Sequence, residues 1–139
     1  MTAMTASARR IVLTERDMDR LRRLVEQNAK GRNAKECEAL EAELDRAEVV
    51  APADVPPEVV TMNSRVRFAD GDTGEEYEAT LVYPFDANAD EWRISVLAPV
   101  GAALLGLSVG QFIDWPMPGG VTKRLRVISV PYQPEAAGE

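Results

Sequence analysis

The sequence predicts an α+β protein: a short antiparallel helical hairpin, forming a coiled coil, followed by a domain with an antiparallel sheet and one short helix. In the first 50 positions apolar residues recur every three or four residues, the spacing of one helix face. After residue 59 they alternate with polar residues, as along a half-buried strand. Between these patterns lies a proline-bearing stretch that cannot continue a helix. We therefore expect a helical hairpin over 1–50, a linker over 51–58 and a second domain over 59–139.

The first helix is expected to begin after Thr14. Asp17 follows Thr14 by three residues, a near match to the capping box, in which side chains satisfy the free N–H groups of a helix start. One apolar stripe follows at helical spacing, and Gly31 marks the end of the helix. The stripe consists of Met18, Leu21, Leu24 and Val25.

A second helix is expected to begin near Asn33, where Asn33-Ala34-Lys35-Glu36 is another capping pattern. Its apolar residues are Cys37, Leu40, Leu44 and Ala47. Two such stripes joined by a short loop can cover each other, so we expect the helices to pack antiparallel. With about 14 residues in each helix and about 1.5 Å of rise per residue, the hairpin is on the order of 20 Å long.

The second domain is expected to contain strands over 65–68, 77–83, 92–97, 112–115 and 125–130. Residues 70–74 and 118–120 are rich in glycine and favour turns, and 84–91 is a polar loop. Pro99 suits the first position of a short apolar helix over 100–105, which Gly106 would close. We expect this helix to cover one face of the sheet.

The composition excludes several classes of function. The chain has 139 residues, 16 Lys and Arg, 23 Asp and Glu, a net charge of −7, one Cys and no His. The absence of His excludes imidazole-based triads and most catalytic zinc sites, and a single Cys excludes an intrachain disulfide. The acidic balance argues against sequence-specific DNA binding. No stretch approaches the roughly 20 apolar residues that cross a bilayer, so we expect a cytoplasmic protein without a membrane partner.

No residue pattern predicts a metal, a cofactor or a catalytic centre. Asp86-Ala87-Asn88-Ala89-Asp90 begins like a calcium loop, but Glu91 stands where that loop requires glycine, so we interpret it as a turn. The cluster around Asp70 is interpreted in the same way. Cys37 lies on the apolar stripe and is expected to be buried. A hydrolytic carboxylate pair in the second half stays open, because sequence alone does not place two side chains across a cleft.

Two segments are candidates for binding a partner. Lys30 and Arg32 make the tip of the hairpin positive, which fits either a solvated loop or a contact with an acidic surface or nucleic-acid phosphate. The second segment is the string of small and apolar residues at a strand-to-helix junction, from which side chains can be presented to a partner. It comprises Leu97, Ala98, Pro99, Val100 and Gly101 and continues to Gly106.

This second string resembles the strand–Pro–helix segment of the bacterial Gre transcript-cleavage factors. The likeness is greater to the Rnk family, which is related to the Gre factors and named for regulation of nucleoside diphosphate kinase. It extends from about Ile11 to the C-terminus and includes several separated strings in the same order. They are Asn63-Ser64-Arg65-Val66-Arg67-Phe68, Leu81-Val82-Tyr83-Pro84, Ile94 to Gly106, and Ile113-Asp114-Trp115-Pro116.

The resemblance implies a coiled-coil hairpin, an FKBP-like C-terminal domain and docking on RNA polymerase near its secondary channel. In cleavage-competent Gre factors, acidic residues at the hairpin tip help to hold a catalytic magnesium ion. Here the tip reads Asn28-Ala29-Lys30-Gly31-Arg32-Asn33 and has no carboxylate. We therefore expect a non-catalytic modulator of elongation that competes with Gre factors without stimulating cleavage. Ala98 replaces the serine that precedes the proline in Gre factors.

Two alternatives remain. An FKBP-like fold is also compatible with a peptidyl-prolyl isomerase, for which Trp92 and Trp115 would be candidate pocket residues. The family name also implies control of nucleoside diphosphate kinase. A transcription factor could exert that control indirectly, through expression of the kinase.

Overall fold

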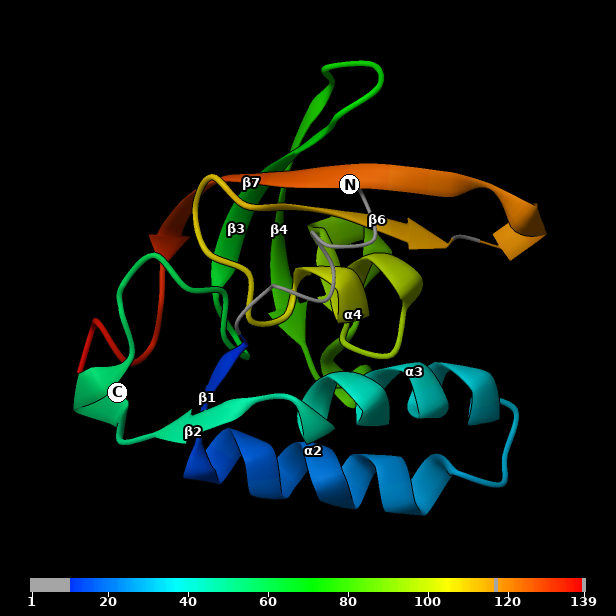
Figure 1. Ribbon diagram of the computed structural model, residues 1–139, viewed down its shortest axis with the longest axis vertical. Helices are drawn as coiled ribbons and strands as arrows, with labels where there is room; N and C mark the ends of the chain where they lie inside the picture. Colours follow the sequence, from blue (N-terminus) through cyan, green and yellow to red (C-terminus); the bar gives the residue numbers. More distant parts are fainter. Residues whose placement is uncertain (1–10, 117, 139) are drawn as a thin grey trace.

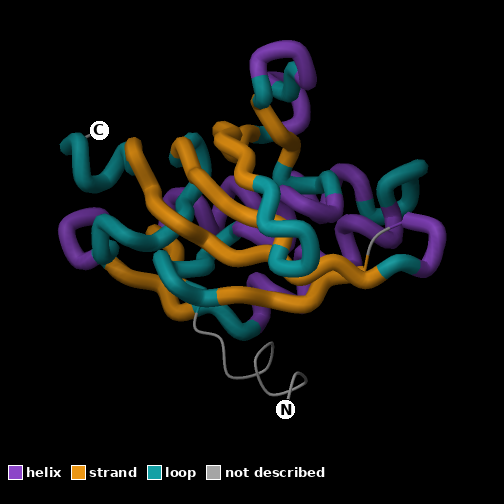
Figure 2. The backbone as a smooth tube through the Cα atoms, turned by 90° about the horizontal axis from the view of Figure 1, so that it is seen from above, coloured by secondary structure: helices purple, strands orange, loops and turns teal. Residues whose placement is uncertain are grey.

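The computed structural model describes residues 11–116 and 118–138, and within them the fold is α+β with a mostly antiparallel sheet (Figures 1 and 2). The helical hairpin lies on one side of the molecule and the five-stranded sheet on the other, with the short helix α4 between them (Figure 1). Seen from above, the strands cross over the helices (Figure 2). Within these residues, no helix is both long and apolar enough to cross a membrane.

The first helix, α2 (Glu15–Asn28), begins where the capping pattern predicts. Thr14 is its N-cap, and the Thr14 hydroxyl accepts a hydrogen bond from the Asp17 backbone N–H at 3.1 Å. This bond satisfies one of the N–H groups that a helix start leaves free. The second helix, α3 (Ala34–Asp45), buries the predicted stripe of Cys37, Leu40 and Leu44. Arg22 of α2 and Asp45 of α3 form an ion pair of 2.9 Å across the hairpin.

Two short strands that the sequence analysis did not predict frame the hairpin. β1 (Val12–Thr14) precedes α2, β2 (Glu48–Val50) follows α3, and they pair in parallel. Each has three residues, too few for an alternating pattern to be recognised. The pairing brings the two ends of the hairpin together.

The large sheet has the strand order β5-β4-β3-β7-β6. Its strands are β3 (Arg65–Asp70), β4 (Glu76–Val82), β5 (Arg93–Ser95), β6 (Phe112–Pro116) and β7 (Thr122–Tyr132). The prediction of an antiparallel sheet is wrong at β5, which pairs in parallel with β4 and is shorter than expected. The reason is that residues 84–91 do not make a tight turn but cross over through two 3-10 helices, η2 (Pro84–Asp86) and η3 (Ala89–Glu91).

One hydrophobic core connects the hairpin with the sheet domain. Leu21 of α2 and Leu40 of α3 belong to the same buried cluster as Leu104 and Leu107, and all four side chains are at most 1% exposed. The contact is direct, because α3 packs against α4 (Pro99–Leu104). The hairpin therefore lies against the domain along its length and does not project freely from it.

The stretch 51–58 is also packed against the rest of the chain. It contains a 3-10 helix, η1 (Pro52–Asp54), and the side chain of Val55 is buried. The amide of Gln133, near the C-terminus, donates to the backbone oxygens of Pro56 and Val59, both at 2.8 Å. These bonds fasten the C-terminal segment to the segment that follows the hairpin.

Candidate partner-binding site

The junction between β5 and α4 is shaped by tight backbone packing. Pro99 occupies the first turn of α4, as predicted, and the Ser95 hydroxyl accepts from the Leu97 N–H at 3.0 Å. A Cβ atom at Gly101 would clash with the Ser95 carbonyl oxygen, so glycine is required for the close approach of helix and strand. Leu97 and Gly101 are buried, whereas Ala98, Pro99 and Val100 are half-buried. The part of the string that a partner can reach is thus its centre.

A groove of about 380 Å³ runs between this junction and the hairpin. Its lining residues are Lys35, Glu36 and Ala39 of α3 together with Leu97, Pro99, Ala102 and Trp115. Trp115 therefore lies beside Pro99, while Trp92 stacks on Tyr77 at 5.7 Å between ring centroids. The two tryptophans, both candidates for an isomerase pocket in the sequence analysis, therefore do not line this groove together.

The hairpin tip is the loop between α2 and α3. Gly31 donates to the Asn28 oxygen and Ala34 donates to the Gly31 oxygen, both at 3.2 Å, which closes the loop tightly. Lys30 and Arg32 are exposed on it. No Asp or Glu lies between Gln27 and Lys35, so the tip presents positive charge only.

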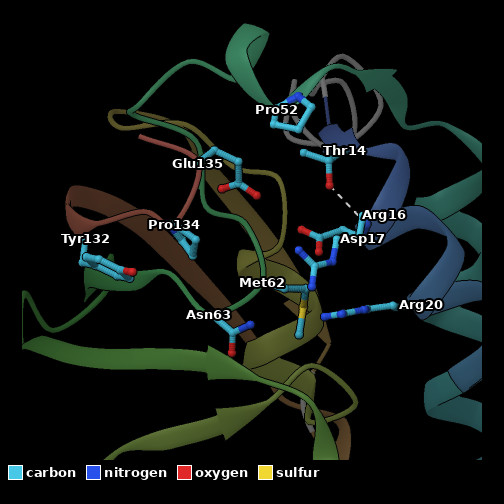
Figure 3. A pocket seen from close by; sticks show the side chains of 10 residues that line it. All are labelled: Thr14, Arg16, Asp17, Arg20, Pro52, Met62, Asn63, Tyr132, Pro134 and Glu135. Atoms are coloured by element: carbon cyan, nitrogen blue, oxygen red, sulfur yellow. Dashed lines mark hydrogen bonds between the residues drawn. The ribbon is translucent and has the colours of Figure 1, made fainter. Parts of the chain in front are cut away.

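A second pocket, of about 330 Å³, lies where α2 begins, between the hairpin and the C-terminal segment (Figure 3). In Figure 3, Arg16, Asp17 and Arg20 of α2 extend toward Met62 and Asn63. Glu135 approaches from the C-terminal segment and accepts a hydrogen bond from the Thr61 hydroxyl at 2.8 Å. Two carboxylates and two guanidinium groups therefore share this junction.

Asp17 is only 7% exposed, which sequence reasoning did not anticipate for a charged residue in a helix cap. The Met62 backbone N–H donates to its carboxylate, while Oδ2 has no partner within the described part of the chain. Burial, with the nearby charge of Glu135, raises the pKa of Asp17 from 3.8 to about 6, although Arg16 and Arg20 act in the opposite direction. Asp17 is therefore a buried carboxyl group that titrates close to neutral pH.

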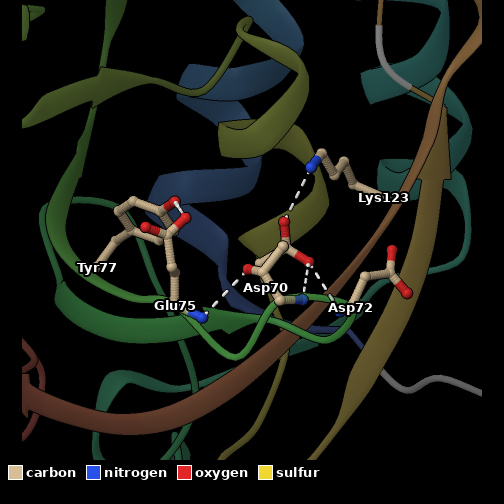
Figure 4. Close-up of polar contacts among 6 residues, drawn as sticks. Asp70, Asp72, Glu75, Tyr77 and Lys123 are labelled. Carbon is tan, nitrogen blue, oxygen red and sulfur yellow. Dashed lines mark hydrogen bonds and ion pairs between the residues drawn. The ribbon is translucent and has the colours of Figure 1, made fainter.

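The turn between β3 and β4 is held by its own polar side chains (Figure 4). Asp70 accepts from the backbone N–H groups of Asp72 at 2.8 Å and Thr73 at 3.3 Å, and from Lys123 Nζ at 2.9 Å. The bonds from Lys123 and from the turn lower the pKa of Asp70. These contacts confirm the interpretation of this cluster as a turn, because the carboxylate is already occupied.

The other acidic segment, Asp86 to Asp90, belongs to the loop that contains η2 and η3. The Asn88 side chain accepts from the Asp90 N–H at 3.0 Å and caps η3. Within residues 11–116 and 118–138, no group of three or more Cys, Asp or Glu side chains is arranged to hold a metal ion. Cys37 is buried, as predicted from the apolar stripe, and burial raises the pKa of its thiol.

An aromatic pair follows β4, and the sequence analysis named only one of its members, Tyr83, as part of a strand and of a family string. Phe85 is 84% exposed and stacks on the buried Tyr83, with ring centroids 6.2 Å apart. The signal that could have found Phe85 is its place as a phenylalanine within an otherwise polar loop, since such a side chain gains nothing from exposure to water. A groove of about 400 Å³ lies beside this pair.

Comparisons with known proteins agree with the geometry. The family model "Rnk N-terminus" matches residues 9–50, and "Transcription elongation factor, GreA/GreB, C-term" matches 55–132. The regulator of nucleoside diphosphate kinase from Escherichia coli K12 is 48% identical over 129 residues, which cover 93% of this chain and 94% of the relative. A solved structure of a GreA/GreB transcription elongation factor from Nitrosomonas europaea has a TM-score of 0.70 and 48% identity, over 88% of this chain and 98% of the other.

The likeness to full-length GreA is more limited. GreA of Clostridium botulinum (strain Alaska E43) is 36% identical over 84 residues, which cover 60% of this chain but only 52% of GreA. Nearly whole-length matches are found to the regulator of nucleoside diphosphate kinase and to the Nitrosomonas europaea protein, while the match to this GreA covers little more than half of either chain. On this evidence the chain belongs to the Rnk family, whose C-terminal region is that of the GreA/GreB transcription elongation factors.

Proposed function

We propose that this chain binds RNA polymerase near the secondary channel as a non-catalytic modulator of transcription elongation. It would compete there with Gre factors and would not stimulate transcript cleavage. Membership of the Rnk family and the GreA/GreB C-terminal region support a role in elongation. The proposal that the chain does not stimulate cleavage depends on the hairpin tip. There Lys30 and Arg32 are exposed, and no carboxylate lies between residues 27 and 35.

The chemistry of cleavage explains why the tip decides this point. Phosphoryl transfer assisted by magnesium needs oxygen ligands, which carboxylates supply. Ammonium and guanidinium groups have only donors and repel a divalent cation. The helices of 14 and 12 residues span about 20 Å, and their packing against α4 limits how far the tip can extend.

For docking on polymerase we propose the edge formed by Ala98, Pro99 and Val100. The three side chains are half-buried, apolar and adjacent to a groove, and Pro99 has a fixed backbone that loses little entropy on binding. Leu97 and Gly101 support this edge from below, since both are buried. Lys30 and Arg32 would then face the inside of the channel.

We treat the link to nucleoside diphosphate kinase as indirect, through transcription. No nucleotide-binding glycine loop is present in the sequence. Mixing the purified chain with the kinase tests this directly. A change in kinase activity without polymerase would contradict the transcriptional route.

The test of the proposal uses backtracked elongation complexes with GreA present at a fixed concentration. We expect this chain alone to release no cleaved RNA, and increasing amounts of it to suppress the cleavage that GreA stimulates. Pro99→Glu should weaken the suppression, while Pro57→Glu, at an exposed proline outside the edge, should not. Cleavage by the chain alone, or no competition at saturating concentration, would overturn the proposal.

A further inference from the structure

One face of α2 carries three arginines that form no ion pair within the described residues. Arg16, Arg20 and Arg23 are spaced by four and three residues, so they lie on one side of the helix, and all three are exposed. We call them the arginine face. By contrast, Arg22 points to α3 and pairs with Asp45.

The arginine face borders the groove beside Phe85. Arg20, Arg23, Leu24 and Gln27 line one wall, while Tyr83 and Phe85 line the other. Phe85 has one ring face on Tyr83, with an angle of 9° between the rings, and the remainder of its side chain is open to solvent. An exposed aromatic ring beside exposed guanidinium groups has the composition of a protein-binding hot spot.

The arginine face also continues toward the pocket around Asp17. Arg20 acts on the hydroxyl of Tyr83, a side chain that is 7% exposed, through its charge and a side-chain hydrogen bond. Arg20 lines both this groove and the pocket around Asp17, so the two hollows adjoin.

We propose that the arginine face and the Tyr83–Phe85 pair bind an acidic segment of a protein partner. Carboxylates of the segment would pair with Arg20 and Arg23, and one apolar side chain would rest against Phe85 and Leu24. Charge complementarity predicts an acidic partner, because the exposed guanidinium groups of Arg20 and Arg23 line the groove and can bind carboxylates bidentately. The apolar side chains of Leu24 and Phe85 in the groove predict that the segment also carries a hydrophobic side chain.

A protein segment fits this surface better than a nucleic acid. From Arg16 to Arg23 the helix rises only about 10 Å, which matches about three residues of extended peptide but too few phosphates for a backbone track. Exposed Glu15, Asp19 and Glu26 lie on the same helix, and the whole chain carries a net charge of −7. Both would repel a polyphosphate that extends beyond the arginine face.

This inference rests on the proposed function in one respect, since the partner that supplies the segment is RNA polymerase. It adds a contact that is separate from the Pro99 edge. A partner that touches both surfaces would hold the hairpin as well as the domain. Association should then depend on salt concentration, because exposed charges are screened.

The test measures binding of the fluorescently labelled chain to purified core RNA polymerase free of nucleic acid. Arg20→Gln with Arg23→Gln, and separately Phe85→Ser, should each weaken binding by about tenfold. The control is Arg22→Gln with Arg126→Gln, which changes the net charge equally at other exposed positions and should leave affinity within about twofold. Circular dichroism should show that all variants remain folded with only small changes in unfolding temperature, because the replaced side chains are exposed and the interactions of Arg20 with Asp17 and of Arg22 with Asp45 each involve an exposed arginine.

Each outcome has a distinct meaning. If the wild-type chain does not bind polymerase, the proposed function and this inference both fail. If it binds and the arginine and Phe85 variants bind equally well, only the inference fails. A single-stranded RNA of 12 nucleotides serves as the competing probe. Loss of RNA binding in these variants, with polymerase binding unchanged, would assign the surface to nucleic acid and overturn the inference.

Discussion

Replacing Asp17 by asparagine should stabilise the fold, and the gain should depend on pH. The Asp17 carboxyl group is 7% exposed, and its pKa rises from 3.8 to about 6 in the folded chain. The folded state therefore holds this proton more tightly than the unfolded state does. The stability that this proton contributes is present in full below the unfolded pKa of 3.8. It is lost as the pH rises through the folded pKa of about 6.

The magnitude follows from the shift. A difference of about two pKa units corresponds to about 3 kcal/mol at pH 7.5, with 1.36 kcal/mol for each unit. At pH 4 the same linkage leaves only about half a kcal/mol, because the carboxyl group is then largely protonated in the folded chain. Asparagine has nearly the same shape, and its oxygen can still accept from the Met62 N–H. The cap bond from the Asp17 backbone to Thr14 does not involve the side chain.

The assay is urea unfolding followed by circular dichroism at pH 4, 5, 6 and 7.5. We expect Asp17→Asn to raise the free energy of unfolding by about 2 to 3 kcal/mol at pH 7.5 and by much less at pH 4. The value at pH 7.5 includes a loss of a few tenths of a kcal/mol, because asparagine no longer places a negative charge at the helix N-terminus. Asp19→Asn, at an exposed carboxylate of the same helix, is the control and should change little at either pH. A gain that is equal at all pH values, or a loss at pH 7.5, would refute the argument that the buried charge is the source of the cost.

Two further changes test the packing and the turn. Leu40→Ala should lower the free energy of unfolding by about 2 to 5 kcal/mol in the same urea assay, because Leu40 is fully buried where the hairpin joins the domain core. A change under about 1 kcal/mol would mean that the hairpin does not share this core. Asp70→Asn should destabilise the chain at pH 7, and the difference should shrink as the pH falls below the ordinary Asp pKa of about 3.9, because the low pKa of Asp70 makes its carboxylate form the stabilising one. A thermal unfolding series from pH 2.5 to 7 measures this difference, and a difference that does not vary with pH would contradict the role of the Lys123 contact.

The helices could be predicted because their signals are local. Thr14 and the stripe through Leu21 and Val25 predict α2, and the structure confirms both its start and its buried face. The same holds for Pro99 at the start of α4, where the fixed backbone angle of proline decides the position. In these places the information lies within a few residues of the element that it specifies.

Pairing between distant segments could not be predicted. β1 and β2 are three residues long, and only their contact across the whole hairpin makes them strands. The parallel direction of β5 depends on the course of residues 84–91, for which the sequence indicates a loop but not a crossover. Such features depend on tertiary contacts that no local pattern encodes.

The candidate surfaces show the same limit. The positive tip with Lys30 and Arg32 could be predicted because the loop is exposed in any hairpin. The burial of Asp17 could not, since a helix cap with an acidic residue is usually solvated, and the groups that act on it here, the Met62 N–H and the Glu135 carboxylate, come from distant parts of the chain. The arginine face is visible in the sequence as a spacing, but its importance depends on Phe85, more than 60 residues away.

The shortness of the hairpin and its packing against α4 have one physical cause. Helices of 14 and 12 residues are close to the length at which isolated helices are marginal in water, so the hairpin cannot be held by its own seam alone. Cys37, Leu40 and Leu44 therefore lie in the core that α4 completes. The positions of the tip and of the arginine face are then fixed relative to the Pro99 edge. A partner that contacts these surfaces meets one preformed arrangement and does not have to order a mobile arm, which reduces the entropy lost on binding.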